Sequence, residues 1–368
     1  MLISKKMLTF AIWKPIKLQD MKTNKLISRM AAVLSLLVFT TNSFAQEQEW
    51  KEYYKAADGK SGAALKTAFA GIIYNRDEGG SLNNAYNALW THFRTTDALP
   101  NGKVWDMYSN KREMTFGTDQ AGNYKVEGDV YNREHSMPNS WFGGKVMPMY
   151  TDLYHLYPTD GFVNSKRSNH PFGETNGESY KSANNFSKLG KCTYPGYTGT
   201  VFEPNDLYKG DFARTYFYMV TCYEEQIPTW YQKYGVNGSG ETKNAVMATL
   251  DGNTYPGLSS WQLEMMMKWA KNDPVSEKDI KRNNAVYGIQ KNRNPFIDYP
   301  GLEQYIWGDK KNVPFSYDHY ESTGIQTIEA DNAVEAWYTP DGRRLQKPQR
   351  GLNILRMKNG KSKKVLKH

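Results

Sequence analysis

The stretch 130–140 constrains this chain most, because it sets an acid and a base side by side where a strand is expected to end. Val130, Tyr131 and Asn132 have the β-branched and aromatic character of a strand, and they lead directly into Arg133-Glu134-His135. Two further polar runs follow, at 152–161 and 163–169. Three polar runs within about 40 residues indicate a site rather than a solvated loop.

A short helix is predicted immediately after the second polar run. Thr159 or Asp160 can cap its N-terminus, which would place Asn164 and Arg167 one turn apart on one face. Strand, loop and helix could therefore bring Asn164 close to the Glu134-His135 pair.

These residue types suit the hydrolysis of a phosphodiester. Histidine can deprotonate water near neutral pH because its unperturbed pKa is about 6.5, so His135 is the candidate base. Mg²⁺ prefers oxygen ligands and typically takes one or two from the protein, which Glu134 and Asn164 can supply. Arg133 and Arg167 can pair with a phosphate through two parallel hydrogen bonds. The sequence thus predicts a metal-dependent phosphodiesterase.

Zinc is the alternative metal for the same region. Imidazole favours Zn²⁺, so His135, His155, His170 and Glu134 could be ligands. The usual zinc spacings are absent and the chain has only two cysteines, which favours Mg²⁺ or Ca²⁺. The remaining alternative is that Glu134 and His135 lie on a solvated loop and have no catalytic role.

Net charge does not support a nucleic-acid substrate by itself. The whole chain carries +9, of which residues 1–45 contribute +6 and residues 343–368 contribute +10, which leaves −7 for residues 46–342. Binding of a polyanion must therefore depend on a local group of cationic side chains or on a metal ion.

The first 45 residues have the order of a secretory signal peptide. A basic segment begins at Met21, an apolar run covers 30–39, and small residues at 43–45 precede a plausible cleavage before Gln46. The alternative is a membrane anchor, but the apolar run is shorter than the roughly 20 residues of a span. Met21 could also be the true start. We expect an exported protein that is secreted, periplasmic or attached to the cell surface.

The C-terminal part changes character after about residue 322. Short strands are predicted at 325–328, 334–338 and 351–357, followed by a basic end. The segment 323–368 resembles a small β module on many exported proteins of Bacteroidetes, and that resemblance implies sorting or surface attachment. The alternative is a disordered basic tail.

Between these ends the chain looks mostly helical. Apolar residues recur at helical spacing in 64–73, 86–93, 211–219 and 260–269, and a capping box at Ser276 and Asp279 predicts a further helix. Residues 103–109 alternate like a strand. Cys192 and Cys222 could form one bridge or remain two thiols.

The polar runs resemble the motifs of the endonuclease I family of secreted and periplasmic bacterial nucleases. The likeness covers roughly 50–310 and is carried, in order, by 132–142, 152–161, 163–169, 171–174, 210–214 and 290–298. It implies an α+β fold, with a ββα-metal (His-Me finger) nuclease core surrounded by helices over 46–322 and the small C-terminal β segment beyond.

By this resemblance His135 is the general base, and Glu134 and Asn164 bind Mg²⁺, for which Ca²⁺ or Mn²⁺ could substitute. His155 orients the site, and Arg167 is the candidate for holding the phosphate. The expected enzyme is a monomeric endonuclease that cleaves DNA, RNA or both without sequence preference and leaves 5′-phosphate ends. The alternative function is a non-catalytic surface protein that binds polymers through aromatic residues.

Overall fold

A computed structural model describes residues 50–74, 86–111 and 113–317, together with four short strands beyond them. The predicted signal segment and the predicted strand at 325–328 lie outside the described residues. The chain divides into two compact units, Met1–Lys55 and Ala56–His368, and the helices and strands below belong to the second.

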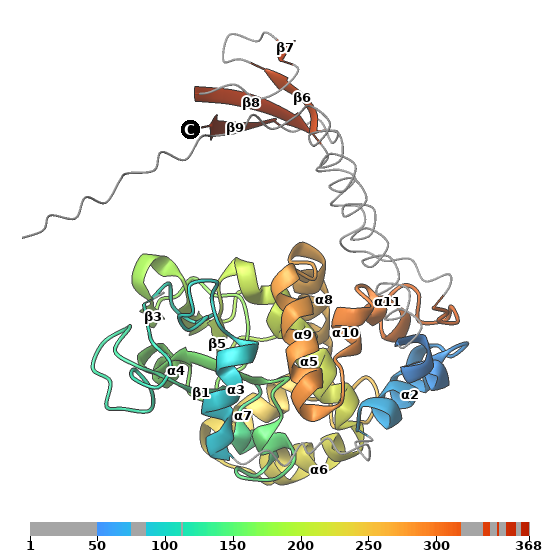
Figure 1. The fold of residues 1–368 in the computed structure, drawn as a ribbon. Helices are drawn as coiled ribbons and strands as arrows, with labels where there is room; N and C mark the ends of the chain where they lie inside the picture. The colour runs from blue at the N-terminus through green and yellow to red at the C-terminus, as the bar shows by residue number, and fades with distance from the viewer. Residues whose placement is uncertain are drawn as a thin grey trace, which may run out of the picture. The chain divides into compact units, whose positions relative to one another are not determined.

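In the described part of the second unit, helices contain more residues than strands do (Figure 1). They are α2 (Gly62–Tyr74), α3 (Leu89–Thr96), α4 (Gly161–Arg167), α5 (Lys209–Cys222), α6 (Ile227–Trp230), α7 (Gly240–Thr249), α8 (Ser260–Asn272), α9 (Glu277–Gln290), α10 (Pro295–Asp298) and α11 (Leu302–Ile306). The strands are β1 (Tyr131–His135), β2 (Leu156–Asp160), β3 (Tyr180–Lys181), β4 (Lys188–Lys191), β5 (Thr200–Glu203), β6 (Val334–Tyr338), β7 (Arg344–Leu345), β8 (Gly351–Met357) and β9 (Ser362–Lys367).

Helix α5 lies at the centre of the helical core. Every residue from Gly210 to Cys222 is buried, and the helix packs against α2, α8 and α10 (Figure 1). Phe212, Tyr216 and Phe217 are each 0% exposed, and burying an aromatic side chain of this size contributes about 1.5–3 kcal/mol. This core explains why the helices predicted at 64–73, 211–219 and 260–269 all form.

Strands β1 and β2 and helix α4 form a ββα unit in chain order. The strands are antiparallel, with Glu134 opposite Tyr157 and His135 opposite Leu156. Helix α4 begins directly after β2, because the Asp160 side chain accepts hydrogen bonds from the amides of Phe162 and Val163. The predicted cap and helix are therefore confirmed, and the mixed α+β class with small antiparallel sheets is as expected.

A buried polar network fixes the turn that leads into β2. The Asp152 carboxylate accepts hydrogen bonds from the hydroxyls of Tyr218 (2.8 Å) and Tyr223 (2.7 Å) and from Nε2 of Gln290 (3.0 Å). Gln290 ends α9, whose predicted capping box is present at Ser276. The polar run 290–298 thus contributes to packing behind the ββα unit.

The strand predicted at 103–109 is wrong. The Asp106 carboxylate accepts hydrogen bonds from the amides of Tyr108 (2.8 Å) and Ser109 (2.9 Å), and this local bonding turns the chain. Within 103–109, Val104 alone pairs as β-structure, in an isolated bridge to Ala98.

Two other antiparallel sheets are present. One has the order β3-β4-β5 and the other β7-β6-β8-β9. The bounds of β6 and β8 match the predicted strands 334–338 and 351–357. Cys192 and Cys222 are both thiols, so the possible bridge is not formed. Within the described residues, no helix is long and apolar enough to cross a membrane.

Candidate active site

Glu134 occupies the second-last position of β1 and is 4% exposed. Its Oε1 accepts hydrogen bonds from the Tyr108 hydroxyl (2.7 Å) and from Nη1 of Arg167 (2.7 Å). Burial raises the pKa of this carboxyl, while the charge of Arg167 and hydrogen bonds from Tyr108 and Asn164 oppose the rise. The carboxylate is therefore held in one orientation with its charge partly balanced.

His135 ends β1, and its ring lies in a stack of aromatic side chains. It stacks on Tyr150 with centroids 5.1 Å apart and on Tyr86 at 6.3 Å. Nε2 lies 3.0 Å from the Tyr150 carbonyl oxygen. A carbonyl only accepts, so Nε2 carries the proton and Nδ1 keeps a lone pair.

The charge state of His135 agrees with this assignment. Burial, followed by the nearby His155, lowers the pKa of His135 to about 3. The imidazole is therefore neutral at physiological pH, with the lone pair on Nδ1.

His155 precedes β2 and is fully buried. Its Nε2 lies 2.6 Å from the carbonyl oxygen of Met149, and burial lowers its pKa. Its own carbonyl accepts hydrogen bonds from the amide (2.9 Å) and hydroxyl (3.0 Å) of Ser136. The backbone of His155 thus ties the end of β1 to the start of β2.

Asn164 lies on α4 and is partly exposed. Its Nδ2 donates to Oδ1 of Asn132 at 2.8 Å, and its amide also lowers the pKa of Glu134 by hydrogen bonding. The three residues predicted to form the centre of the site, Glu134, His135 and Asn164, are therefore gathered on the ββα unit.

Arg167, one turn after Asn164, is 1% exposed. Besides Glu134, its guanidinium donates to the carbonyl oxygens of His135 (3.0 Å) and Ser136 (2.5 Å). The sequence predicts that Arg167 binds a substrate phosphate. The contacts of its guanidinium are those of a residue that positions Glu134. The reason is that the buried carboxylate and carbonyls of β1 surround the guanidinium.

Arg133 is the more open of the two arginines. Its Nη1 donates to the carbonyl oxygen of Tyr86 at 2.8 Å, and its guanidinium lies 3.5 Å from the Tyr86 ring centroid and 4.2 Å from that of Trp90. These planar contacts hold Arg133 at the partly exposed end of the stack that contains His135.

The donor set decides which metal the site could hold. Within the described ranges, no group of three or more His, Cys, Asp or Glu side chains could hold a metal, and His170 pairs with Glu241 at 3.4 Å. The zinc alternative therefore has no ligand set in this part of the chain. One carboxylate and one amide oxygen, on Glu134 and Asn164, fit an ion such as Mg²⁺, which keeps several waters and takes oxygens from a substrate phosphate.

Sequence reasoning missed three residues that shape the site. Tyr108 donates to Glu134, Tyr150 fixes the tautomer of His135, and Asn132 accepts from Asn164. Asn132 is part of the recognised motif, but its role had no sequence signal. Tyr108 and Tyr150 act across long sequence separations, which a one-dimensional pattern does not encode.

The chain is similar to one protein family and to several known nucleases. Residues 61–301 match the family model described as Endonuclease I. The chain is 33% identical over 261 residues to an extracellular ribonuclease of Bacillus amyloliquefaciens, covering 69% of this chain and 78% of that protein. A Bacillus subtilis (strain 168) extracellular ribonuclease gives the same figures, 33% over 261 residues, 69% and 78%. An extracellular deoxyribonuclease of Aeromonas hydrophila is 26% identical over 149 residues, covering 40% of this chain and 49% of that protein. All five predicted site residues lie inside the matched range.

Proposed function

The chain belongs to the Endonuclease I family and is a nuclease that hydrolyses phosphodiester bonds, and we propose that it is an exported, Mg²⁺-dependent endonuclease without sequence preference. One observation carries the proposed mechanism. His135 donates from Nε2 to the Tyr150 carbonyl oxygen, which leaves the lone pair of Nδ1 to take a proton.

The proposed reaction is attack of water on phosphorus. His135 Nδ1 takes a proton from the water as its oxygen bonds to phosphorus, and the bond from phosphorus to the 3′ oxygen breaks. The leaving oxygen receives a proton from solvent, so the products carry a 5′-phosphate and a 3′-hydroxyl. The stack on Tyr150 keeps the imidazole plane fixed during the transfer.

Glu134 and Asn164 would hold the ion, because β1 and α4 bring a carboxylate and a side-chain amide to one place. A bound Mg²⁺ supplies Lewis acidity and offsets the charge on the phosphate and the leaving oxygen. Ca²⁺ or Mn²⁺ has the same preference for oxygen ligands and could substitute.

The other residues act around this centre. Arg167 holds Glu134, and the backbone carbonyl of His155 holds the end of β1 beside the start of β2. Arg133 is partly exposed next to His135, so it is better placed than Arg167 to pair with a substrate phosphate.

Substrate choice follows from what the site contacts. The proposed contacts read phosphate rather than base edges, which gives cleavage without sequence preference. The relatives include proteins described as ribonucleases and as deoxyribonucleases. We therefore propose that both RNA and DNA are cleaved.

Export is proposed from the signal-like segment 1–45, and relatives described as extracellular or periplasmic support it. The proposed nuclease domain is 46–322, acting as a monomer. For the segment 323–368 we propose sorting or surface attachment, on the basis of its resemblance to exported proteins.

The test uses protein beginning at Gln46, incubated with plasmid DNA and with RNA in Mg²⁺ or EDTA. We expect cleavage in Mg²⁺, none in EDTA, and a loss of about 10²–10⁴-fold in His135→Ala. The matched control is His92→Ala, which changes a partly exposed histidine of α3 and should keep full activity. Cleavage that persists in EDTA or in folded His135→Ala would contradict the mechanism. Binding without any cleavage would favour the non-catalytic alternative.

A further inference from the structure

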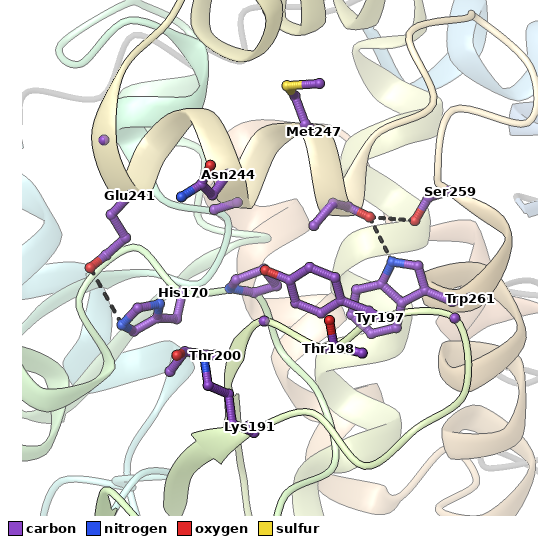
Figure 2. A pocket seen from close by; sticks show the side chains of 16 residues that line it. His170, Lys191, Tyr197, Thr198, Thr200, Glu241, Asn244, Met247, Ser259 and Trp261 are labelled. Carbon is purple, nitrogen blue, oxygen red and sulfur yellow. Dashed lines mark hydrogen bonds and ion pairs between the residues drawn. The ribbon is translucent and has the colours of Figure 1, made fainter.

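A cavity of about 920 Å³ is lined from His170 onward, three residues after the end of α4 (Figure 2). Its walls come from the segment after α4, the loop between β4 and β5, helix α7 and the start of α8. The proposed mechanism uses none of its lining residues. Aromatic rings line one side of it, and charged side chains line the other (Figure 2).

Tyr197 and Trp261 form the aromatic wall. Their rings are stacked, with centroids 4.9 Å apart and planes 16° apart. Trp261 is 6% exposed, and its indole N–H donates to the carbonyl oxygen of Ala248 at 2.7 Å. Tyr197 is partly exposed, so the pair offers a fixed ring to the cavity.

Two glycines make room for the Tyr197 ring. Gly196 has φ +96, and a Cβ there would lie 2.7 Å from Cβ of Trp261. A Cβ on Gly199 would lie 2.0 Å from the Tyr197 hydroxyl oxygen. A side chain at Gly196 would displace the loop, and one at Gly199 would displace the Tyr197 ring, so both glycines are needed to hold this tyrosine against the tryptophan.

The polar wall contains His170, Glu241 and Lys191 (Figure 2). Glu241 accepts a hydrogen bond from the amide of Asn169 at 2.7 Å and pairs with Nε2 of His170 at 3.4 Å. Lys191 is exposed and lines the cavity with His170 and Glu241 (Figure 2). A cation thus lies at the rim of a cavity with a stacked aromatic pair.

The cavity is connected to the candidate active site through a short piece of chain. The His170 amide donates to the carbonyl oxygen of Arg167 at 3.2 Å. His170 lies six positions after Asn164, and six extended residues span at most about 20 Å. A few nucleotides of a strand cleaved at His135 could cover this distance.

We propose that this cavity is a nucleobase subsite for single-stranded nucleic acid. One base stacks on Tyr197, and Lys191 pairs with the adjacent phosphate of the same strand. Proteins that bind single strands combine aromatic platforms with cations in this way, and every base has a face that can stack. In a duplex the bases are paired and stacked on one another, so the subsite selects single strands. This inference rests on the proposed nuclease function.

The test measures binding by fluorescence anisotropy in full-length protein that carries His135→Ala to prevent cleavage. The probes are fluorescein-labelled oligoadenylates of about 12 nucleotides, one RNA and one DNA, and a duplex of equal length. We expect Tyr197→Ala to weaken single-strand binding about tenfold and to leave duplex binding unchanged. Tyr197→Phe should retain the affinity because it keeps the ring.

Tyr194→Ala is the matched control, because Tyr194 lies in the same loop, is partly exposed and does not line the cavity. It should bind all probes like the parent protein. Lys191→Ala should reduce the slope of log affinity against log salt by about 0.7 for single strands.

Two results separate this inference from the proposed function. If the protein with His135 intact cleaves nucleic acid but Tyr197→Ala binds single strands like Tyr194→Ala, the subsite is wrong and the nuclease proposal stands. If the protein with His135 intact neither cleaves nor binds nucleic acid, both are wrong. An equal loss for duplex and single strand would also overturn the base subsite, because stacking in the cavity requires an unpaired base.

Discussion

Arg167 Nη1 lies 2.7 Å from Glu134 Oε1, and the two side chains are 1% and 6% exposed. The pair joins α4 to β1, the two elements that carry the proposed metal ligands. The pair stabilises the fold because each charge offsets the cost of burying the other. Each charge would be costly in this environment alone, and together they allow a carboxylate to remain ionised inside the protein.

Removing Arg167 should therefore destabilise the fold as well as the site. We expect Arg167→Ala to lower the free energy of unfolding by about 3–5 kcal/mol, because Glu134 would remain buried without its partner. Urea unfolding monitored by tryptophan fluorescence measures this. Lys281→Ala, which breaks a surface pair with Glu277, should change nothing measurable.

The double variant Glu134→Gln with Arg167→Met tests the stated cause. It should recover part of the stability lost in Arg167→Ala, because no uncompensated charge remains. Equal instability of the double and single variants would refute charge compensation as the cause.

Asp160 links the stability of α4 to catalysis. Its carboxylate accepts hydrogen bonds from the amides of Phe162 and Val163 at the start of the helix that carries Asn164. We expect Asp160→Ala to cost about 0.5–2 kcal/mol of unfolding free energy and to lower activity by displacing the helix. Asp160→Asn keeps a capping oxygen and should preserve most of both. If Asp160→Ala and Asp160→Asn have the same activity and unfolding free energy, the capping oxygen does not stabilise α4 or support activity.

Asn164 should control metal affinity without affecting the fold. In Asn164→Ala we expect the Mg²⁺ concentration for half-maximal cleavage to rise by about tenfold or more, a loss of at least ~1.4 kcal/mol in binding. The neighbouring Ser165→Ala, on the same helix and exposed, is the control. Identical Mg²⁺ requirements in the two variants would exclude Asn164 as a ligand.

His155 should make stability fall in mild acid. Burial lowers its pKa, so below its ordinary value of about 6.5 the unfolded chain binds a proton that the folded protein does not. The stability of the wild-type protein therefore declines as pH falls through this window, by up to about 1.4 kcal/mol per pH unit from this one group. His155→Gln removes the contribution.

The measurement is the difference in unfolding free energy between wild type and His155→Gln at several pH values from about 7.5 to about 5. The difference is needed because burial raises the pKa of Asp106 to about 7, and that shift acts in the opposite direction. A difference that does not change with pH would show that His155 takes up a proton equally in both states.

The sequence anticipated several elements because their causes are local. The capping box at Ser276 and the cap at Asp160 depend on residues two or three positions away, so both could be read directly and both are present. The prediction of a strand at 103–109 was wrong, and the cause is also local. Its alternating pattern was outweighed by the hydrogen bonds of Asp106 to the amides that follow it.

For the candidate site, the sequence alone predicted a strand that leads into Glu134 and His135 and a capped helix that carries Asn164, and the family resemblance implied their ββα order. It could not assign the contacts that come from distant parts of the chain. Only the tertiary structure decided that Arg167 turns inward to Glu134, that Tyr108 donates to the same oxygen, and that the Tyr150 carbonyl fixes the proton on His135. The physical reason is that caps and periodicity act between near neighbours, whereas burial, pKa and tautomer depend on which remote groups folding brings within hydrogen-bonding distance.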